Sequence, residues 1–312
     1  MIDKKQCVES ETVMKISGNV FGSKSEKLNY DRIIKQWGDR YNIYHNFPFM
    51  MIFDISPSEV SNTVFQYLLK TSVDYVVCDL NDRPLMGIEF DGFQQGSNIG
   101  TEYVPKKGFD ESRKWRIETK LQIAQECNFP LVVTSDREFE LLSDTGLTIV
   151  DGIIGALTSR IYFKREFQQS NFEEYVFKRF SLNPEEFARL DKREQSEIFE
   201  SFGISIEVDS DMQNPVVNRR WQIHGMLRQH FGLSVGKFPL LWSMGGVNVS
   251  DPKKFRGGKF TWKHPEYGEI ETIVILPLFE ITDQKLYVGS IAINIAALIG
   301  ITKMAKRMGV TI

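Results

Sequence analysis

The residues best suited to chemistry lie in the segment Val73–Asp91. Two apolar runs, 73–79 and 84–91, flank a turn-rich segment, which predicts a β-hairpin. Side chains alternate between the two faces of a strand. The apolar residues of the second strand therefore lie on one face. Glu89 and Asp91 lie on the other face beside Gly87, and because glycine has no side chain there is room for a ligand.

The register of the hairpin adds a third acid to this face. If the turn is centred on Asn81 and Asp82, Asp74 lies opposite Glu89. Opposed residues lie roughly 4.5–5.5 Å apart, so Asp74, Glu89 and Asp91 would repel one another. A divalent cation resolves the conflict, and carboxylate oxygens suit Mg²⁺. The alternative is that these acids only form ion pairs with nearby Lys and Arg side chains.

Composition indicates a globular, intracellular protein. The chain has 312 residues and a net charge of −3, which excludes a basic footprint over the whole molecule. Residues 1–150 hold 17 basic and 22 acidic residues and residues 151–312 hold 21 and 19, so the second half is the better candidate for contacting a polyanion. Three scattered cysteines and a polar N-terminus predict reduced thiols and a cytoplasmic location. The apolar run Leu286–Ile301 is shorter than the ~20 residues of a membrane span, so we expect a buried helix and no membrane partner.

The elements around the hairpin predict a mixed α/β fold with helices on both sides of a central sheet. In chain order they are a helix at Ser25–Trp37, an extended segment at Tyr41–Phe53, a short helix at Ser58–Lys70, the hairpin, a long loop at Gly92–Asp110, a helix at Glu111–Cys127 and a buried strand at Leu131–Thr134. Ser23 or Ser25 would cap the first helix, and its apolar stripe would consist of Leu28, Ile33, Ile34 and Trp37.

Lys120 lies at the border of the apolar face that Ile117, Leu121 and Ala124 would form on the helix at Glu111–Cys127. A lysine in that position either extends its ammonium to solvent or meets a carboxylate. The acids of the hairpin are the nearest candidates, and the pattern leaves the two alternatives open.

These elements and acids resemble the PD-(D/E)XK nuclease superfamily, with its restriction-endonuclease-like fold, and within it the poorly characterised bacterial domains related to very-short-patch repair endonucleases. The resemblance covers about residues 25–160. It rests on Val73-Asp74-Tyr75-Val76-Val77, Gly87-Ile88-Glu89-Phe90-Asp91-Gly92, Arg116 with Lys120, Phe129-Pro130-Leu131-Val132-Val133, and the helix segment Glu26–Tyr30.

The resemblance implies a core with the element order α-β-β-β-α-β and a Mg²⁺ ion, replaceable by Mn²⁺, bound by Asp74 and Glu89. The superfamily usually places a lysine two residues after the second acid, where this chain has Asp91. Related domains share the acid-x-acid form and take the basic residue from the next helix, which matches Lys120. Asp91 would then assist the metal directly or through water, with Glu26 and Arg116 in supporting roles.

This chemistry predicts a metal-dependent endonuclease that hydrolyses phosphodiester bonds, because carboxylate-bound Mg²⁺ polarises the phosphoryl group and activates water while a lysine stabilises the phosphate charge. DNA is favoured over RNA as the partner, and a protein partner or a second copy could help deliver it. Two rivals stay open. One is a nuclease fold that has lost catalysis and serves as a binding or assembly module, and the other is a structural protein whose acids neutralise Lys106, Lys107, Arg113 and Arg116.

Most of the candidate nucleic-acid contacts lie in the second half. We expect an extension at residues 1–24, a nuclease-like domain at 25–165, and an α/β module at 166–312. The predicted contacts are Lys106, Lys107, Lys253, Lys254, Arg256 and Lys259, the last four on a Gly-rich segment interleaved with Phe255, Phe260 and Trp262. The alternative for that segment is a hairpin whose aromatic residues belong to the core. Arg220, His224 and Arg228 recur every four residues on one helix face, which favours an ordinary solvent face over a polyanion contact.

Overall fold

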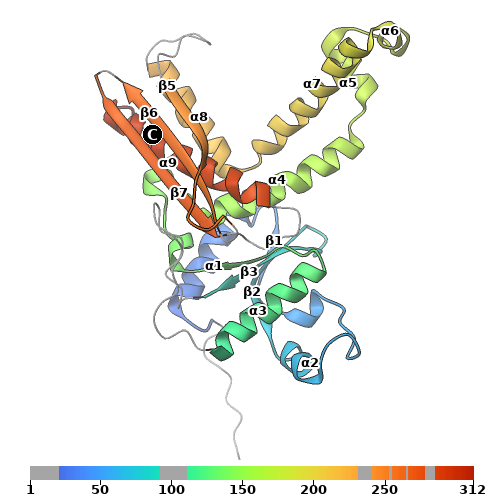
Figure 1. Cartoon of the computed structure of the whole chain (residues 1–312), viewed down its shortest axis with the longest axis vertical. Helices are drawn as coiled ribbons and strands as arrows, with labels where there is room; N and C mark the ends of the chain where they lie inside the picture. The colour runs from blue at the N-terminus through green and yellow to red at the C-terminus, as the bar shows by residue number, and fades with distance from the viewer. Residues whose placement is uncertain (1–20, 92–110, 231–240, 253–254, 265, 278–284) are drawn as a thin grey trace, which may run out of the picture.

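The N-terminal half is built on a four-stranded mixed sheet, in a computed structural model that describes residues 21–91, 111–230, 241–252, 255–264, 266–277 and 285–312 (Figure 1). The strands lie in the order β1 (Asn42–Pro48), β2 (Ser72–Cys78), β3 (Pro84–Phe90) and β4 (Leu131–Thr134). The first three are antiparallel to their neighbours, and β4 runs parallel to β3. With helices α1 (Lys24–Trp37), α2 (Asn62–Leu68) and α3 (Glu111–Glu126), the predicted mixed α/β class and the order of elements are confirmed.

Helices cover both faces of this sheet. On one face α1 contributes Ile33 and Trp37 to a buried cluster with Tyr75, Val77 and Ile88. On the other face a second cluster joins α2 and α3 to the sheet through Leu68, Ile123, Ala124, Val76 and Leu131. The sheet is therefore buried on both sides, and polar side chains between its layers need specific partners.

Helix α1 begins with a capping box, in which Ser23 and Glu26 each accept the backbone N–H of the other. The predicted cap at Ser23 is confirmed, but the predicted apolar stripe is wrong in part, because Leu28 is 51% exposed and Ile34 is 38% exposed. The buried face instead runs through Glu26, Asn29, Ile33 and Trp37.

The predicted hairpin register is confirmed from Tyr75 to Val77 and is wrong next to the turn. Val76 pairs with Gly87 and Tyr75 with Ile88, in line with an Asp74–Glu89 pair one step further. The register shifts at Cys78, which pairs with Pro84. The turn is held by Asp79, whose carboxylate accepts the backbone N–H groups of Asn81 and Arg83.

Helix α3 presents a different face from the one that its apolar pattern predicts. Its buried residues are Thr119, Lys120, Ile123 and Ala124, whereas Ile117 and Leu121 are only half-buried. The predicted burial of Ala124 is confirmed, and that of Ile117 and Leu121 is wrong in part, because the fold turns Lys120 into the interior toward an acid.

The C-terminal half combines helices with a second sheet. The helices are α4 (Ile149–Gln169), α5 (Phe172–Phe180), α6 (Pro184–Arg189), α7 (Lys192–Asp211), α8 (Pro215–His230) and α9 (Lys285–Arg307), and the strands are β5 (Leu241–Val247), β6 (Phe255–His264) and β7 (Gly268–Pro277). The ends of α4 and α7 project from the molecule with α5 and α6 at the tip, while α9 packs on the antiparallel sheet β5-β6-β7 (Figure 1).

Helix α9 passes close to the strand that it covers. A Cβ atom at Gly258 would lie 2.2 Å from the backbone of Ala292, and one at Gly300 would lie 2.1 Å from the ring of Phe260. Within α9, Val288–Arg307 is long and apolar enough to cross a membrane, yet 72% of that window is buried inside the fold. The expected buried C-terminal helix is therefore present.

The segment predicted as a Gly-rich nucleic-acid loop is strand β6. Phe255, Phe260 and Trp262 point into the core, and the intervening lysines Lys259 and Lys263 pair with acids of β7. The alternation of apolar and basic residues thus reflects the two faces of a strand. The loop interpretation was wrong, and the alternative of a hairpin with core aromatics is confirmed.

The two halves share one core. The indole N–H of Trp37 on α1 donates to the carboxylate of Asp151 on α4 over 2.9 Å, in a buried contact. One cluster of buried residues runs from Ile33 through α4 to Val310. The predicted domain boundary at 165 falls within the continuous helix α4, and the assignment of two domains stays a prediction.

Candidate metal-binding site

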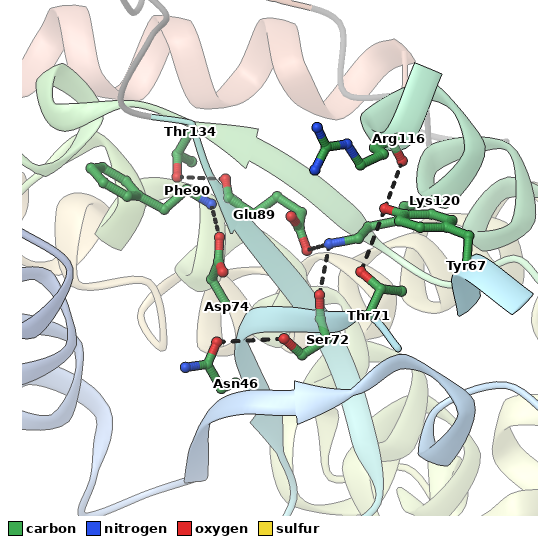
Figure 2. Close-up of polar contacts among 10 residues, drawn as sticks. All are labelled: Asn46, Tyr67, Thr71, Ser72, Asp74, Glu89, Phe90, Arg116, Lys120 and Thr134. Carbon is green, nitrogen blue, oxygen red and sulfur yellow. Dashed lines mark hydrogen bonds and ion pairs between the residues drawn. The ribbon is translucent and has the colours of Figure 1, made fainter. Parts of the chain in front are cut away.

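Asp74 lies where the ladder between β2 and β3 ends. Its Oδ2 accepts the backbone N–H of Phe90 over 2.7 Å, so the side chain takes the place of a ladder bond at this point (Figure 2). This contact fixes the carboxylate beside β3. Burial raises the pKa of Asp74, opposed by the Phe90 N–H and by the positive charge of Lys120.

Glu89 and Lys120 form a buried ion pair. The Nζ of Lys120 donates to Oε1 of Glu89 over 2.7 Å and to the carbonyl oxygen of Ser72 over 2.6 Å (Figure 2). The two side chains are only 10% and 9% exposed. Of the two alternatives for Lys120, contact with a carboxylate is therefore the one that the fold adopts, and it joins α3 to both strands of the hairpin.

The electrostatics of Glu89 are dominated by its burial. Burial, followed by the charge of Asp74, raises the pKa of Glu89 to about 8, against the opposing effect of Lys120. Because the charge of Asp74 contributes to the raised pKa of Glu89, the two carboxylates lie within electrostatic reach of each other. A cation between them would favour both ionised forms.

Asp91 is held apart from this pair. Its backbone N–H donates to the Thr134 carbonyl, and its carboxylate pairs with Arg113 of α3 over 2.5 Å while being almost fully buried. The structure thus brings together two of the three predicted carboxylates and gives the third a cationic partner.

The supporting residues take different positions. Glu26 lies on α1 and accepts from His45 of β1 over 2.6 Å, and both groups contribute to the electrostatics of Asp74. Arg116 donates to the backbone and hydroxyl of Ser112 on its own helix, and its guanidinium is exposed. Arg116 therefore lies one turn before Lys120, as predicted, without joining the ion pair.

Sequence reasoning missed His45 as a neighbour of the site. The signal for it was the register of β1, in which His45 pairs with Tyr75, one residue beyond Asp74. The hydroxyl of Tyr75 donates to the Glu26 carbonyl oxygen and ties α1 to the same place. The register is the same on both sides of Asn46, which has a positive φ of 51° within the strand.

The donor set fits a magnesium ion that keeps most of its water. Within the described ranges, no group of three or more His, Cys, Asp or Glu side chains is placed to hold a metal. Asp74 and Glu89 supply two carboxylates, and Mg²⁺ is commonly held by one or two carboxylates with water and substrate phosphate completing its shell. Asp91 is not needed for such a site.

The predicted nucleic-acid contacts are only partly described. Lys106, Lys107, Lys253 and Lys254 lie outside the described residues. Lys259 pairs with Glu271, and Arg256 donates to the carbonyl oxygens of Pro252 and Phe255.

The face of α8 that carries Arg220, His224 and Arg228 is not an ordinary solvent face. Arg220 is buried and donates to Asn294 of α9, and the ring of His224 stacks on Trp242. This part of the helix serves packing between α8, α9 and β5.

Comparison with known proteins gives this chain no relatives: no family model, no curated protein and no solved structure matches it.

Proposed function

We propose that the chain is a Mg²⁺-dependent endonuclease of the PD-(D/E)XK type, whose restriction-endonuclease-like core is the sheet β1–β4 with its helices. Its substrate would be nucleic acid, with DNA favoured over RNA. The observation that carries the proposal is the convergence of Asp74, Glu89 and Lys120 from β2, β3 and α3. Lys120 lies 31 residues after Glu89, so the fold restores the lysine that the local motif lacks.

Asp74 and Glu89 would hold the ion. When bound, Mg²⁺ supplies a polarised phosphoryl oxygen and a more acidic water. Asp74 is held ready for this role by the Phe90 N–H. Glu89 must be ionised to bind, so its raised pKa means that a proton leaves this carboxyl when the site fills, and metal affinity rises between about pH 6 and 8.

Lys120 would orient the attacking water or stabilise the charge on the phosphate. Its ammonium is held by Glu89 and by the Ser72 carbonyl, and it has three donors. One donor can therefore reach a substrate oxygen while the other two keep the side chain in position. Preorganised donors of this kind stabilise a developing charge at little reorganisation cost.

The test is cleavage of plasmid, linear and single-stranded DNA and of RNA with Mg²⁺ or Mn²⁺, comparing the native chain with Glu89→Gln. Glu118→Gln is the matched control, because Glu118 is an exposed glutamate on α3. We expect metal-dependent cutting by the native chain and the control, and none by Glu89→Gln. Cutting that persists in Glu89→Gln would contradict the assignment.

Metal binding is measured separately by calorimetry. We expect the native chain to bind Mg²⁺ and Asp74→Ala to lose that binding, and equal binding by both proteins would remove Asp74 from the site. This measurement does not depend on knowing the substrate.

A second candidate is a nuclease fold that binds or assembles without cutting. What favours it is that Lys120 already neutralises Glu89 and Arg113 already neutralises Asp91. Such a protein would bind nucleic acid or a partner with Glu89→Gln as well as with the native chain. Cleavage by the native chain would exclude it.

A further inference from the structure

A cavity lies far from the carboxylates, at the other end of α1. It is widely open to solvent and has a volume of about 380 Å³, between α1, the segment before α4, and the junction where α7 ends and α8 begins. Gln36 lines it ten residues after Glu26, which corresponds to about 15 Å along the helix. A volume of this size is typical of small-molecule sites.

The charged side chains that line this cavity are both cations. Arg40 comes from the turn that follows α1, Arg219 comes from α8, and no acid lines the cavity. Within the described part of the chain neither guanidinium pairs with a carboxylate: Arg40 donates to the Gln213 carbonyl oxygen and stacks on Trp37, and Arg219 donates to Gln222. Two guanidinium groups with neutral partners make this cavity attractive to an anion.

The rest of the lining suits a heterocyclic base. Side-chain amides of Gln36, Gln213, Asn218 and Gln222 line the cavity. Gln213 and Asn218 each donate to a backbone carbonyl and Gln222 donates to Asn218, so a base would bind through the remaining donors and acceptors of these amides. Leu147, Met212 and Pro215 add an apolar wall. An inorganic anion would use only the arginines, whereas a ligand with a phosphate at one end and a flat, polar-edged ring at the other would use the whole cavity.

We propose that this cavity binds a nucleoside monophosphate, with the phosphate between Arg40 and Arg219 and the base against the amides and the apolar wall. The site is independent of the metal site. Because it is built from both halves of the chain, a ligand there would also stabilise the junction between α1 and α8.

The experiment is calorimetric titration of the full chain with AMP, GMP, CMP and UMP in buffer containing EDTA, so that the metal site cannot contribute. Adenosine and inorganic phosphate are titrated as the two halves of the ligand. We expect at least one monophosphate to bind about tenfold or more tightly than either half. Binding of phosphate as tight as that of every nucleotide would overturn the assignment to a nucleotide.

Variants locate the binding. Arg40→Gln and Arg219→Gln should each weaken it about tenfold or more, while Arg83→Gln, an exposed arginine of the hairpin turn, should leave it unchanged. Both test residues are partly or fully exposed, and unchanged thermal unfolding would show that the variants fold. Unchanged affinity in both test variants, or no monophosphate binding below about 1 mM, would overturn the proposal.

Discussion

At the scale of the residue, Glu89 couples the stability of the fold to pH. Its pKa rises from 4.5 to about 8 on folding, because burial and Asp74 disfavour its charge. Between these values the folded chain keeps a proton that the unfolded chain releases, so the free energy of unfolding falls as pH rises. Above about pH 8 both states are ionised and this contribution is fully lost.

Glu89→Gln should flatten that fall, because an amide has no proton to lose. We expect the native chain to lose stability between about pH 5 and 8 relative to the variant, as measured by urea unfolding across that range. Glu118→Gln, which changes an exposed glutamate on α3, should behave like the native chain. Parallel curves for the native chain and Glu89→Gln would show that Glu89 does not hold the proton.

Lys120→Met removes one partner of the buried pair. Without Lys120 the pKa of Glu89 would rise further, so near pH 8 this carboxyl must either take up a proton or carry an uncompensated charge, and we expect a loss of roughly 3 kcal/mol in the free energy of unfolding there. Near pH 6 the loss should be smaller, because Glu89 is protonated there. Adding Glu89→Gln to Lys120→Met should recover part of the loss in a double-mutant cycle.

The matched control is Lys114→Met, whose lysine lies on the same helix with its side chain 49% exposed. Its effect should stay within about 0.5 kcal/mol at both pH values. A loss for Lys120→Met that is no larger than that of the control would show that the ion pair contributes nothing to the fold.

At the scale of the element, the two-residue alternation of strands predicted buried faces better than the 3.6-residue periodicity of helices did. The alternation along β3 fixed its register with β2, because a slip by one residue would turn Glu89 into the opposite layer. Residues 255–264 alternate in the same way, but their glycines also suited a loop, and the sequence left both alternatives open. In the structure Gly258 lies where the backbone of α9 comes close to β6. The buried face of α3 differs from the predicted one because the apolar pattern of a helix does not indicate a buried lysine.

Gly258→Ala tests how closely α9 lies on β6. Its Cβ would meet backbone atoms of Ala292 and Ile293 at 2.2 Å, and backbone cannot turn aside as a flexible side chain can. We expect a loss of at least about 2–3 kcal/mol in the free energy of unfolding by urea. Gly245→Ala is the control on β5, where a Cβ would meet nothing within 4 Å, and a similar cost for both would contradict the packing.

At the scale of the whole molecule, the sequence suggested two domains while the structure joins them through one core. No linker marks the predicted boundary at 165, which lies inside the continuous helix α4. The contacts that bridge the halves are long-range: Trp37 of α1 meets Asp151 of α4 across 114 residues. Such contacts depend on how the finished layers stack, and no local pattern indicates them.

The shared core predicts that the halves do not fold separately. Ile153 and Ile154 of α4 belong to a buried cluster that continues into the C-terminal half. In a fragment of residues 21–165 α4 would lose α7, α8 and α9 as neighbours and expose part of that cluster. We expect the full chain to unfold in one calorimetric transition and the fragment to show none, since exposing several large apolar side chains at about 1.5–3 kcal/mol each exceeds the stability of a typical domain. A fragment with its own cooperative transition would instead establish residues 21–165 as an independent domain and place the junction, with its cavity, between two separable units.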